Sequence, residues 1–172
     1  MRTSFSTVST LPATIDALVV GVASSGALPA GLGYTRSELS AIGFDGRCCQ
    51  TTVIPASGKS PVRVLVGLGE MNSLNANTVR LVAAAAARAS ARYAKVATTL
   101  VSDARGNAKE NAQAVVEGMA LALHRYVDLK NDKSSLPTLT SVVLVVRASA
   151  AQAKLGVANG VATATAVCTA RD

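Results

Sequence analysis

Few side chains in this 172-residue chain could carry out chemistry. Its single histidine, His124, has Arg125 and Tyr126 beside it and no second imidazole with which to share a metal ion. A zinc site needs three or four nitrogen, sulfur or carboxylate ligands in one place. We therefore interpret His124 as a residue at a helix end, where its protonated form would interact favourably with the helix dipole.

The carboxylates are dispersed along the chain. Two-metal and glycosidase-type reactions both need carboxylates held close together. The acidic residues instead occur singly, as Asp16, Glu38, Asp45, Glu70, Asp103, Glu110, Glu117, Asp128, Asp132 and Asp172. The sequence therefore predicts no catalytic residue and no metal ligand within this chain.

The three cysteines, Cys48, Cys49 and Cys168, indicate reduced thiols and not a disulfide framework. Their number is odd, no C-x-x-C motif occurs, and reduced cysteines are typical of cytosolic proteins. Cys49 is predicted to begin a strand, where consecutive side chains point to opposite faces. A disulfide between Cys48 and Cys49 is therefore disfavoured.

Gly67-Leu68-Gly69 follows a buried apolar run, as the loop of a dinucleotide-binding motif does. The motif is incomplete, because Asn72 stands where a third glycine is needed and the next predicted helix begins several residues later. A tight turn is the favoured interpretation. The phosphate-binding motif G-x-x-x-x-G-K-[ST] does not occur either, so no cofactor is predicted for this chain.

Arg80, Arg88 and Arg92 are spaced by multiples of four residues, with Ala84 in the gap, and should form a basic stripe on one predicted helix. The chain has a formal net charge of +7. The favoured interpretation is a solvated face that keeps an alanine-rich helix soluble. The alternative is a set of contacts to the phosphates of duplex DNA.

The elements that position these residues follow from apolar runs and helix signals. Strands are predicted at residues 3–9, 17–22, 49–54, 62–69, 95–101 and 142–146. A short helix is predicted near 35–43, and long helices over 75–93, 108–126 and 149–172. Strands alternating with helices predict an α/β fold with a mostly parallel or mixed sheet.

The chain should be a soluble cytoplasmic protein. No apolar run reaches the roughly 20 residues that span a bilayer, and no apolar signal segment precedes Pro12 and Asp16. The last predicted helix runs to Asp172 without a Gly or Pro stop signal. We therefore expect it to lead into a further part of a longer protein.

Three segments, taken in order, resemble the amino-terminal domain of the leucyl aminopeptidase (cytosol aminopeptidase) family. They are VLVGLG at residues 64–69, EGMALALHRYVDLK at 117–130 and AVCTARD at 166–172. The resemblance extends over essentially the whole chain. The sequence departs from the family pattern at His124, Val127 and Leu129, where the family usually has aromatic residues.

The resemblance implies a macro-domain-like, three-layer α/β/α fold over residues 1–148 and a connector helix over 149–172. It also implies a full-length parent that forms a hexamer and releases N-terminal amino acids from peptides. Two divalent metal ions, zinc or manganese, and the catalytic residues would lie in the missing carboxyl-terminal domain. No position of this chain matches them.

Three hypotheses follow for the chain itself. The first is a non-catalytic amino-terminal domain that serves assembly and positioning. The second is a DNA-binding module, motivated by the net charge of +7 and the stripe of Arg80, Arg88 and Arg92; the resemblance adds that some bacterial members of the family bind DNA. The third, by analogy with macro domains, is a binder of ADP-ribose or a related nucleotide, and fold analogy alone supports it weakly.

Overall fold

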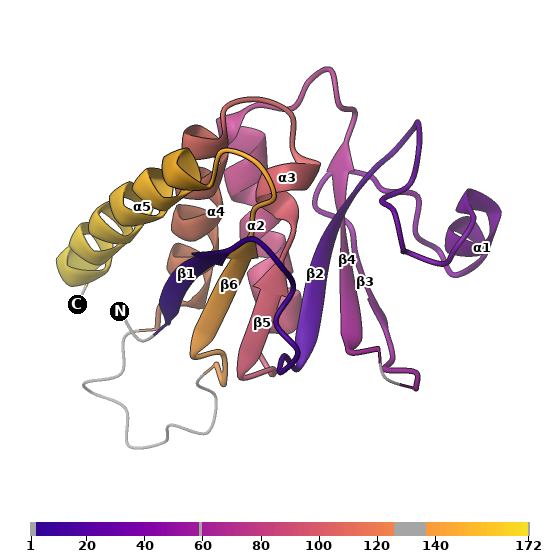
Figure 1. Ribbon diagram of the computed structural model, residues 1–172, viewed down its shortest axis with the longest axis horizontal. Helices are drawn as coiled ribbons and strands as arrows, with labels where there is room; N and C mark the ends of the chain where they lie inside the picture. Colours follow the sequence, from indigo (N-terminus) through magenta and orange to yellow (C-terminus); the bar gives the residue numbers. More distant parts are fainter. Residues whose placement is uncertain (1–2, 59, 126–136, 172) are drawn as a thin grey trace.

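A six-stranded sheet organises the fold (Figure 1), in a computed structural model that describes residues 3–58, 60–125 and 137–171. In chain order the elements are β1 (Ser4–Val8), β2 (Ala17–Ala23), α1 (Arg36–Ala41), β3 (Thr51–Ile54), β4 (Val62–Gly69), α2 (Ala76–Ser90), β5 (Lys95–Thr98), α3 (Leu100–Asp103), α4 (Ala108–Leu123), β6 (Ser141–Val145) and α5 (Ala150–Arg171). The strand order is β1-β6-β5-β2-β4-β3. Every neighbouring pair is parallel except β3, which runs antiparallel to β4. The predicted α/β fold with a mixed, largely parallel sheet is therefore confirmed.

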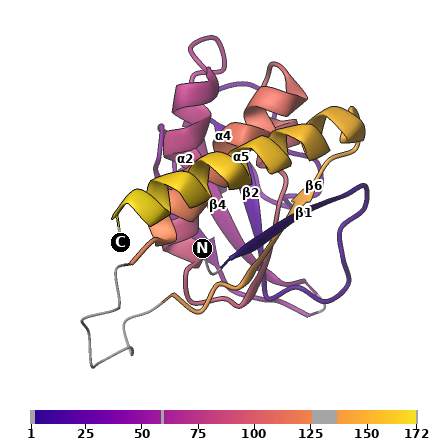
Figure 2. The ribbon, with the colours of Figure 1, turned by 90° about the vertical axis from the view of Figure 1, so that its left-hand side faces the viewer.

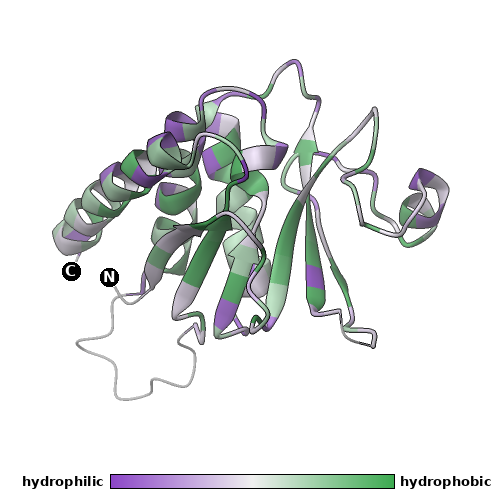
Figure 3. Cartoon of the chain, in the orientation of Figure 1, coloured by the Kyte–Doolittle hydropathy of each residue, from purple (hydrophilic) through white to green (hydrophobic). Residues whose placement is uncertain are grey.

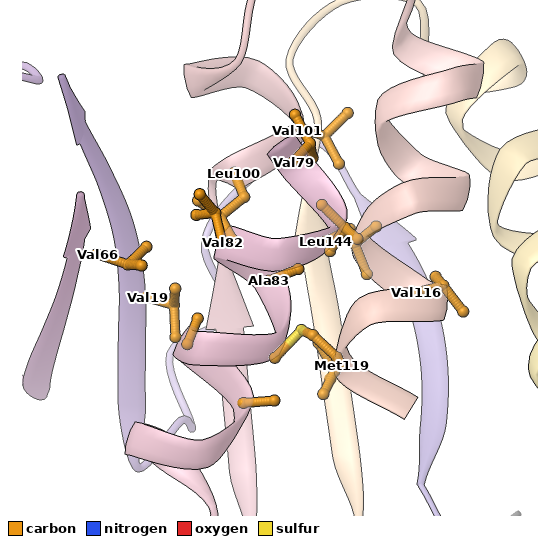
Figure 4. Packing of buried hydrophobic residues seen from close by; sticks show 14 of the residues in the cluster. Val19, Val66, Val79, Val82, Ala83, Leu100, Val101, Val116, Met119 and Leu144 are labelled. Carbon is orange, nitrogen blue, oxygen red and sulfur yellow. The ribbon is translucent and has the colours of Figure 1, made fainter. Parts of the chain in front are cut away.

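Alternate residues of the central strands supply two separate cores. Val19 and Val66 face the side covered by α2 and α4, where Val82 and Met119 pack against them (Figure 4). Val20 and its neighbours face the other side, which α1 and the loop after β2 cover with residues that include Leu39 and Phe44. This alternation follows from the two-residue period of a strand. The sheet thus lies between a thick helical layer and a thinner one built from α1 and its loop.

Small residues let the three long helices of the thick layer pack closely. A methyl group added at Gly118 of α4 would lie 2.2 Å from the carbonyl oxygen of Arg80 in α2. One added at Gly156 of α5 would lie 2.1 Å from the carbonyl oxygen of Lys109 in α4. Helix α5 therefore lies directly against α4, along the β1 edge of the sheet (Figure 2). The aromatic-poor composition is compensated by short distances between helix backbones.

The stripe that α5 turns toward α4 consists of Ala153, Gly156, Val157, Gly160, Ala164 and Cys168. The rest of its surface mixes polar and apolar residues, so the helix has no strongly hydrophobic outer face (Figure 3). Leu155 is the large apolar residue that α5 leaves exposed. Within the described part of the chain, no helix has the length and apolar character required to cross a bilayer.

Four details of the predicted elements were wrong. The strand at 95–101 ends at Thr98, because Thr99 begins the turn into α3, which the sequence did not predict. The helix predicted over 75–93 ends at Ser90. Helix α4 ends at Leu123 and not at Tyr126, which lies outside the described residues. The strand predicted from Cys49 begins at Thr51, so both adjacent cysteines lie in the turn before it.

Candidate functional site

His124 lies directly after α4 as its C-cap residue, as the helix-end interpretation predicted. Among residues 3–58, 60–125 and 137–171, no three His, Cys, Asp or Glu side chains come together in a way that could hold a metal ion.

The three arginines of the predicted basic stripe point to different partners. Arg80 turns toward α4, while Arg88 is exposed and lies near Cys49 in the turn before β3. Arg92 is outside α2, and its Nη2 donates to the hydroxyl of Tyr93 at 2.7 Å. The prediction of one continuous basic stripe on this helix was therefore wrong, because α2 ends at Ser90, before Arg92. Contacts with DNA stay a prediction. Arg88 and Arg92, the exposed members of the set, would have to make them.

Arg80 forms an interhelical ion pair with Glu117, a residue of the EG segment that carries the family resemblance. The Nε of Arg80 donates to Oε2 of Glu117 at 2.7 Å, and the Glu117 residue is only 5% exposed. Its other carboxylate oxygen accepts a hydrogen bond from Nε2 of Gln113 at 2.8 Å. The adjacent Gly118 lies where the backbones of α2 and α4 come close together, since an added Cβ would lie 2.2 Å from the carbonyl oxygen of Arg80. Both residues therefore serve the α2–α4 contact.

A cavity of about 430 Å³ lies on the α1 side of the sheet, beside the first half of β2 and the carboxyl ends of β5 and β6. After β2, the chain crosses the side of the sheet that α1 covers. After β5, it crosses the opposite side, which α4 covers. Such a reversal between neighbouring parallel strands opens a crevice where α/β proteins commonly bind ligands. The walls combine apolar side chains with polar ones, among them Leu18, Val20, Val145, Arg63, Asp103 and Arg147.

Asp103 is the titratable group of this cavity with the most perturbed environment. Its Oδ2 accepts hydrogen bonds from the backbone N–H of Gly21 at 2.8 Å and from Oγ1 of Thr99 at 2.6 Å. Burial raises the pKa of Asp103 to about 6, against the opposing effects of these two hydrogen bonds and of nearby Arg147. Asp103 can therefore change its protonation state just below neutral pH, which makes it the candidate ligand-contacting carboxyl.

Sequence reasoning placed Asp103 among the dispersed carboxylates and did not single it out. The available signal was its position shortly after the buried strand β5, at the edge where the carboxyl ends of parallel strands meet. That signal was hidden by the unpredicted turn of α3, which carries Asp103 back toward Gly21. The cavity also gives the nucleotide-binding hypothesis a specific location, which titration calorimetry with ADP-ribose would test.

Replacing Asp103 with asparagine should change how stability depends on pH. The folded-state pKa of about 6 lies above the ordinary value of 3.8, so the folded chain holds the proton more tightly than the unfolded chain. The stabilisation is complete below the unfolded pKa and is lost as the pH rises through the folded pKa. Urea unfolding at about pH 4, 5 and 7 should show the wild type losing stability relative to Asp103→Asn as the pH increases. A difference that stays constant over this range would contradict the assignment.

Comparison with known proteins gives a consistent family. The sequence model of the cytosol aminopeptidase family, N-terminal domain, matches residues 19–133. The chain is 33% identical to a probable cytosol aminopeptidase of Rhodococcus opacus (strain B4), over 92% of this chain and 34% of that protein. It is 36% identical to one of Rhodococcus jostii (strain RHA1), over 78% of this chain and 26% of that protein. The chain thus spans about a third of the first relative and about a quarter of the second.

Two solved structures resemble the fold. The bottromycin maturation enzyme BotP is 30% identical, with a TM-score of 0.73, over 92% of this chain and 32% of that one. A mutant of tomato leucine aminopeptidase is 18% identical, with a TM-score of 0.64, over 97% of this chain and 36% of that one. The second likeness concerns the fold alone.

Proposed function

This chain belongs to the cytosol aminopeptidase family, whose N-terminal domain matches residues 19–133, and we propose what it does on that basis. It is the non-catalytic N-terminal domain of a metal-dependent leucyl aminopeptidase. The observation that carries the proposal is the coverage. The matching family model describes an N-terminal domain, and the chain spans only 34% and 26% of its two Rhodococcus relatives. The parent protein would release N-terminal amino acids from peptides in the cytoplasm. Its chemistry would lie outside this chain.

The role proposed for the domain is assembly and positioning of the catalytic part within a hexamer. Helix α5 supports this role, because it is anchored on α4 by a stripe of small residues and exposes its opposite side, including Leu155. A helix held rigidly on one side can position whatever packs on the other. The two divalent ions, zinc or manganese, would be bound by the catalytic part, which supplies their ligands in this proposal.

A chimera tests this role. The chain would replace the corresponding N-terminal region of the Rhodococcus opacus relative, and molar mass and hydrolysis of leucyl-p-nitroanilide would be measured with manganese or zinc. We expect a hexamer with metal-dependent activity, compared with the intact relative and with its catalytic part alone. A chimera that is monomeric and no more active than the catalytic part alone would contradict the proposed role.

Binding of duplex DNA is a second candidate function, favoured by the net charge of +7 and by the exposure of Arg88 and Arg92. Phosphate contacts would make the affinity fall steeply as salt increases. Arg80 should contribute less, since Glu117 already pairs with it. Absence of any DNA complex at low salt would remove this candidate.

A further inference from the structure

The adjacent cysteines lie in a four-residue turn over residues 47–50. The backbone N–H of Gln50 donates to the carbonyl oxygen of Arg47 at 2.9 Å, which closes the turn. Cys49 is its third residue and has a φ of 63°, in the left-handed region. Turns with this geometry usually place glycine or asparagine there, because a side chain strains the backbone. A cysteine at this position is therefore unusual and calls for an explanation.

The left-handed conformation brings the two thiols together. Consecutive side chains of an extended strand point to opposite faces. In the turn, the Sγ atoms of Cys48 and Cys49 instead lie 3.7 Å apart. Cys48 is exposed and Cys49 is partly buried, so the pair can be reached from solvent.

Hydrogen bonds on both sides hold this turn in place. The backbone N–H of Cys49 donates to the carbonyl oxygen of Gly67 in β4 at 2.9 Å, and the N–H of Gly67 donates to the carbonyl oxygen of Gln50 at 2.7 Å. The side chain of Gln50 also accepts from the N–H groups of Asp45 and Arg47 and donates to the carbonyl oxygen of Gly43. The thiols are thus presented by a fixed backbone, which lowers the ordering cost of binding both at once.

The charges around the pair favour stepwise reaction at the two sulfurs. Burial, the hydrogen bond with Cys48 and the charge of the Cys48 thiolate raise the pKa of Cys49 to about 11, while Arg88 in α2 acts in the opposite direction. Cys49 therefore keeps its proton more strongly than an ordinary cysteine does. Attack begins at Cys48, the sulfur that is exposed to solvent, and the thiol of Cys49 follows.

We propose that Cys48 and Cys49 form a chelating dithiol site for a thiophilic metalloid, namely a trivalent arsenical that bonds to both sulfurs. Two sulfur–metal bonds of about 2.3 Å at a tetrahedral angle span about 3.8 Å, as in zinc thiolates, and the observed pair has nearly this spacing. The reaction is a ligand exchange without oxidation or reduction. Two S–H bonds and two As–O bonds break, two As–S bonds form, and the two protons leave with the two hydroxide groups as water.

Phenylarsine oxide, which reacts as its hydrate, is the probe. The reduced 172-residue chain would be treated with it and examined by intact mass spectrometry, first alone and then with an excess of glutathione or of 2,3-dimercaptopropanol. We expect one adduct per chain that survives the monothiol and is removed by the dithiol. Because the second As–S bond forms within one molecule, losing it should weaken retention on the order of 100-fold.

Three variants decide the outcome. Cys48→Ser and Cys49→Ser should each lose the glutathione-resistant adduct, whereas Cys168→Ala should keep it, since Cys168 is a buried cysteine on α5. Circular dichroism would establish that each variant is folded. In the wild type, bound arsenical should protect Cys48 and Cys49 together from alkylation. An adduct that persists in either turn variant, or a wild-type adduct that glutathione removes, would overturn the proposal.

Discussion

Replacing Arg80 with alanine should lower the free energy of unfolding by about 2 kcal/mol, which is in the range for leaving a buried charged group without its hydrogen-bond partner. The loss is smaller than for a fully buried pair, because the Arg80 side chain is 35% exposed. The Glu117 side chain is 6% exposed, and its carboxylate would lose its only oppositely charged partner among the described residues. Gln113 would still donate a hydrogen bond to it, but an amide does not neutralise a buried charge. Urea unfolding monitored by circular dichroism at neutral pH gives the measurement.

Two further variants show whether burial of the charge is the cause. Arg92→Ala removes an arginine from the exposed surface beyond α2 and should change stability by less than about 0.5 kcal/mol. The double variant Arg80→Met with Glu117→Met removes both charges while keeping apolar volume, and should recover most of the loss. If Arg80→Ala were no more destabilising than Arg92→Ala, the α2–α4 contact would not depend on this pair.

Gly118→Ala should also destabilise the chain, by about 2 kcal/mol. Helix propensity alone predicts a gain of about 1 kcal/mol from this change. The added methyl group, however, would lie 2.2 Å from the backbone oxygen of Arg80 and 3.0 Å from the Cβ of Ala83. A backbone atom cannot rotate away as a side chain can, so α2 and α4 must separate. The overpacking cost should therefore exceed the gain in propensity.

Asn159→Ala is the matched control for Gly118→Ala, since Asn159 is an exposed residue within α5. It should stabilise the chain slightly, because alanine is the better helix former and nothing crowds an exposed position. Both variants would be compared by thermal unfolding. A Gly118→Ala chain as stable as the wild type would show that α2 and α4 are not packed as closely as described.

The sheet could be predicted from sequence because its strands are continuous apolar runs between clear turn residues. Residues 17–22 and 62–69 illustrate this, since such runs are favoured where both faces of a strand are covered. The order of the strands could not be predicted, because parallel pairing depends on contacts between distant segments. The antiparallel β3 at the edge is one example.

The candidate site was largely hidden from sequence reasoning, for a different reason. Arg80 and Arg88 share a spacing that suggests one surface, yet Arg80 turns to the carboxylate of Glu117, a residue 37 positions away. Asp103 gains its environment from Gly21, which is 82 positions away. The approach of Cys48 to Cys49 depends on one left-handed residue. Each of these outcomes is set by tertiary contacts or by a single backbone angle, and local patterns report neither.

The EG pair of the segment that resembles the aminopeptidase family has a structural explanation. Glu117 pairs with Arg80, and Gly118 allows the backbones of α2 and α4 to approach. Both residues stabilise the packing of α2 against α4, and neither is placed to act on a reacting group. This agrees with the proposed division of labour, in which this domain supplies shape and the catalytic part supplies chemistry.

The most direct test of that division is the aminopeptidase activity of the 172-residue chain alone. It would be assayed on leucyl-p-nitroanilide with added manganese or zinc, beside the intact Rhodococcus opacus relative. We expect no hydrolysis above that of the metal ions without protein. Appreciable metal-dependent turnover by the isolated chain would contradict it.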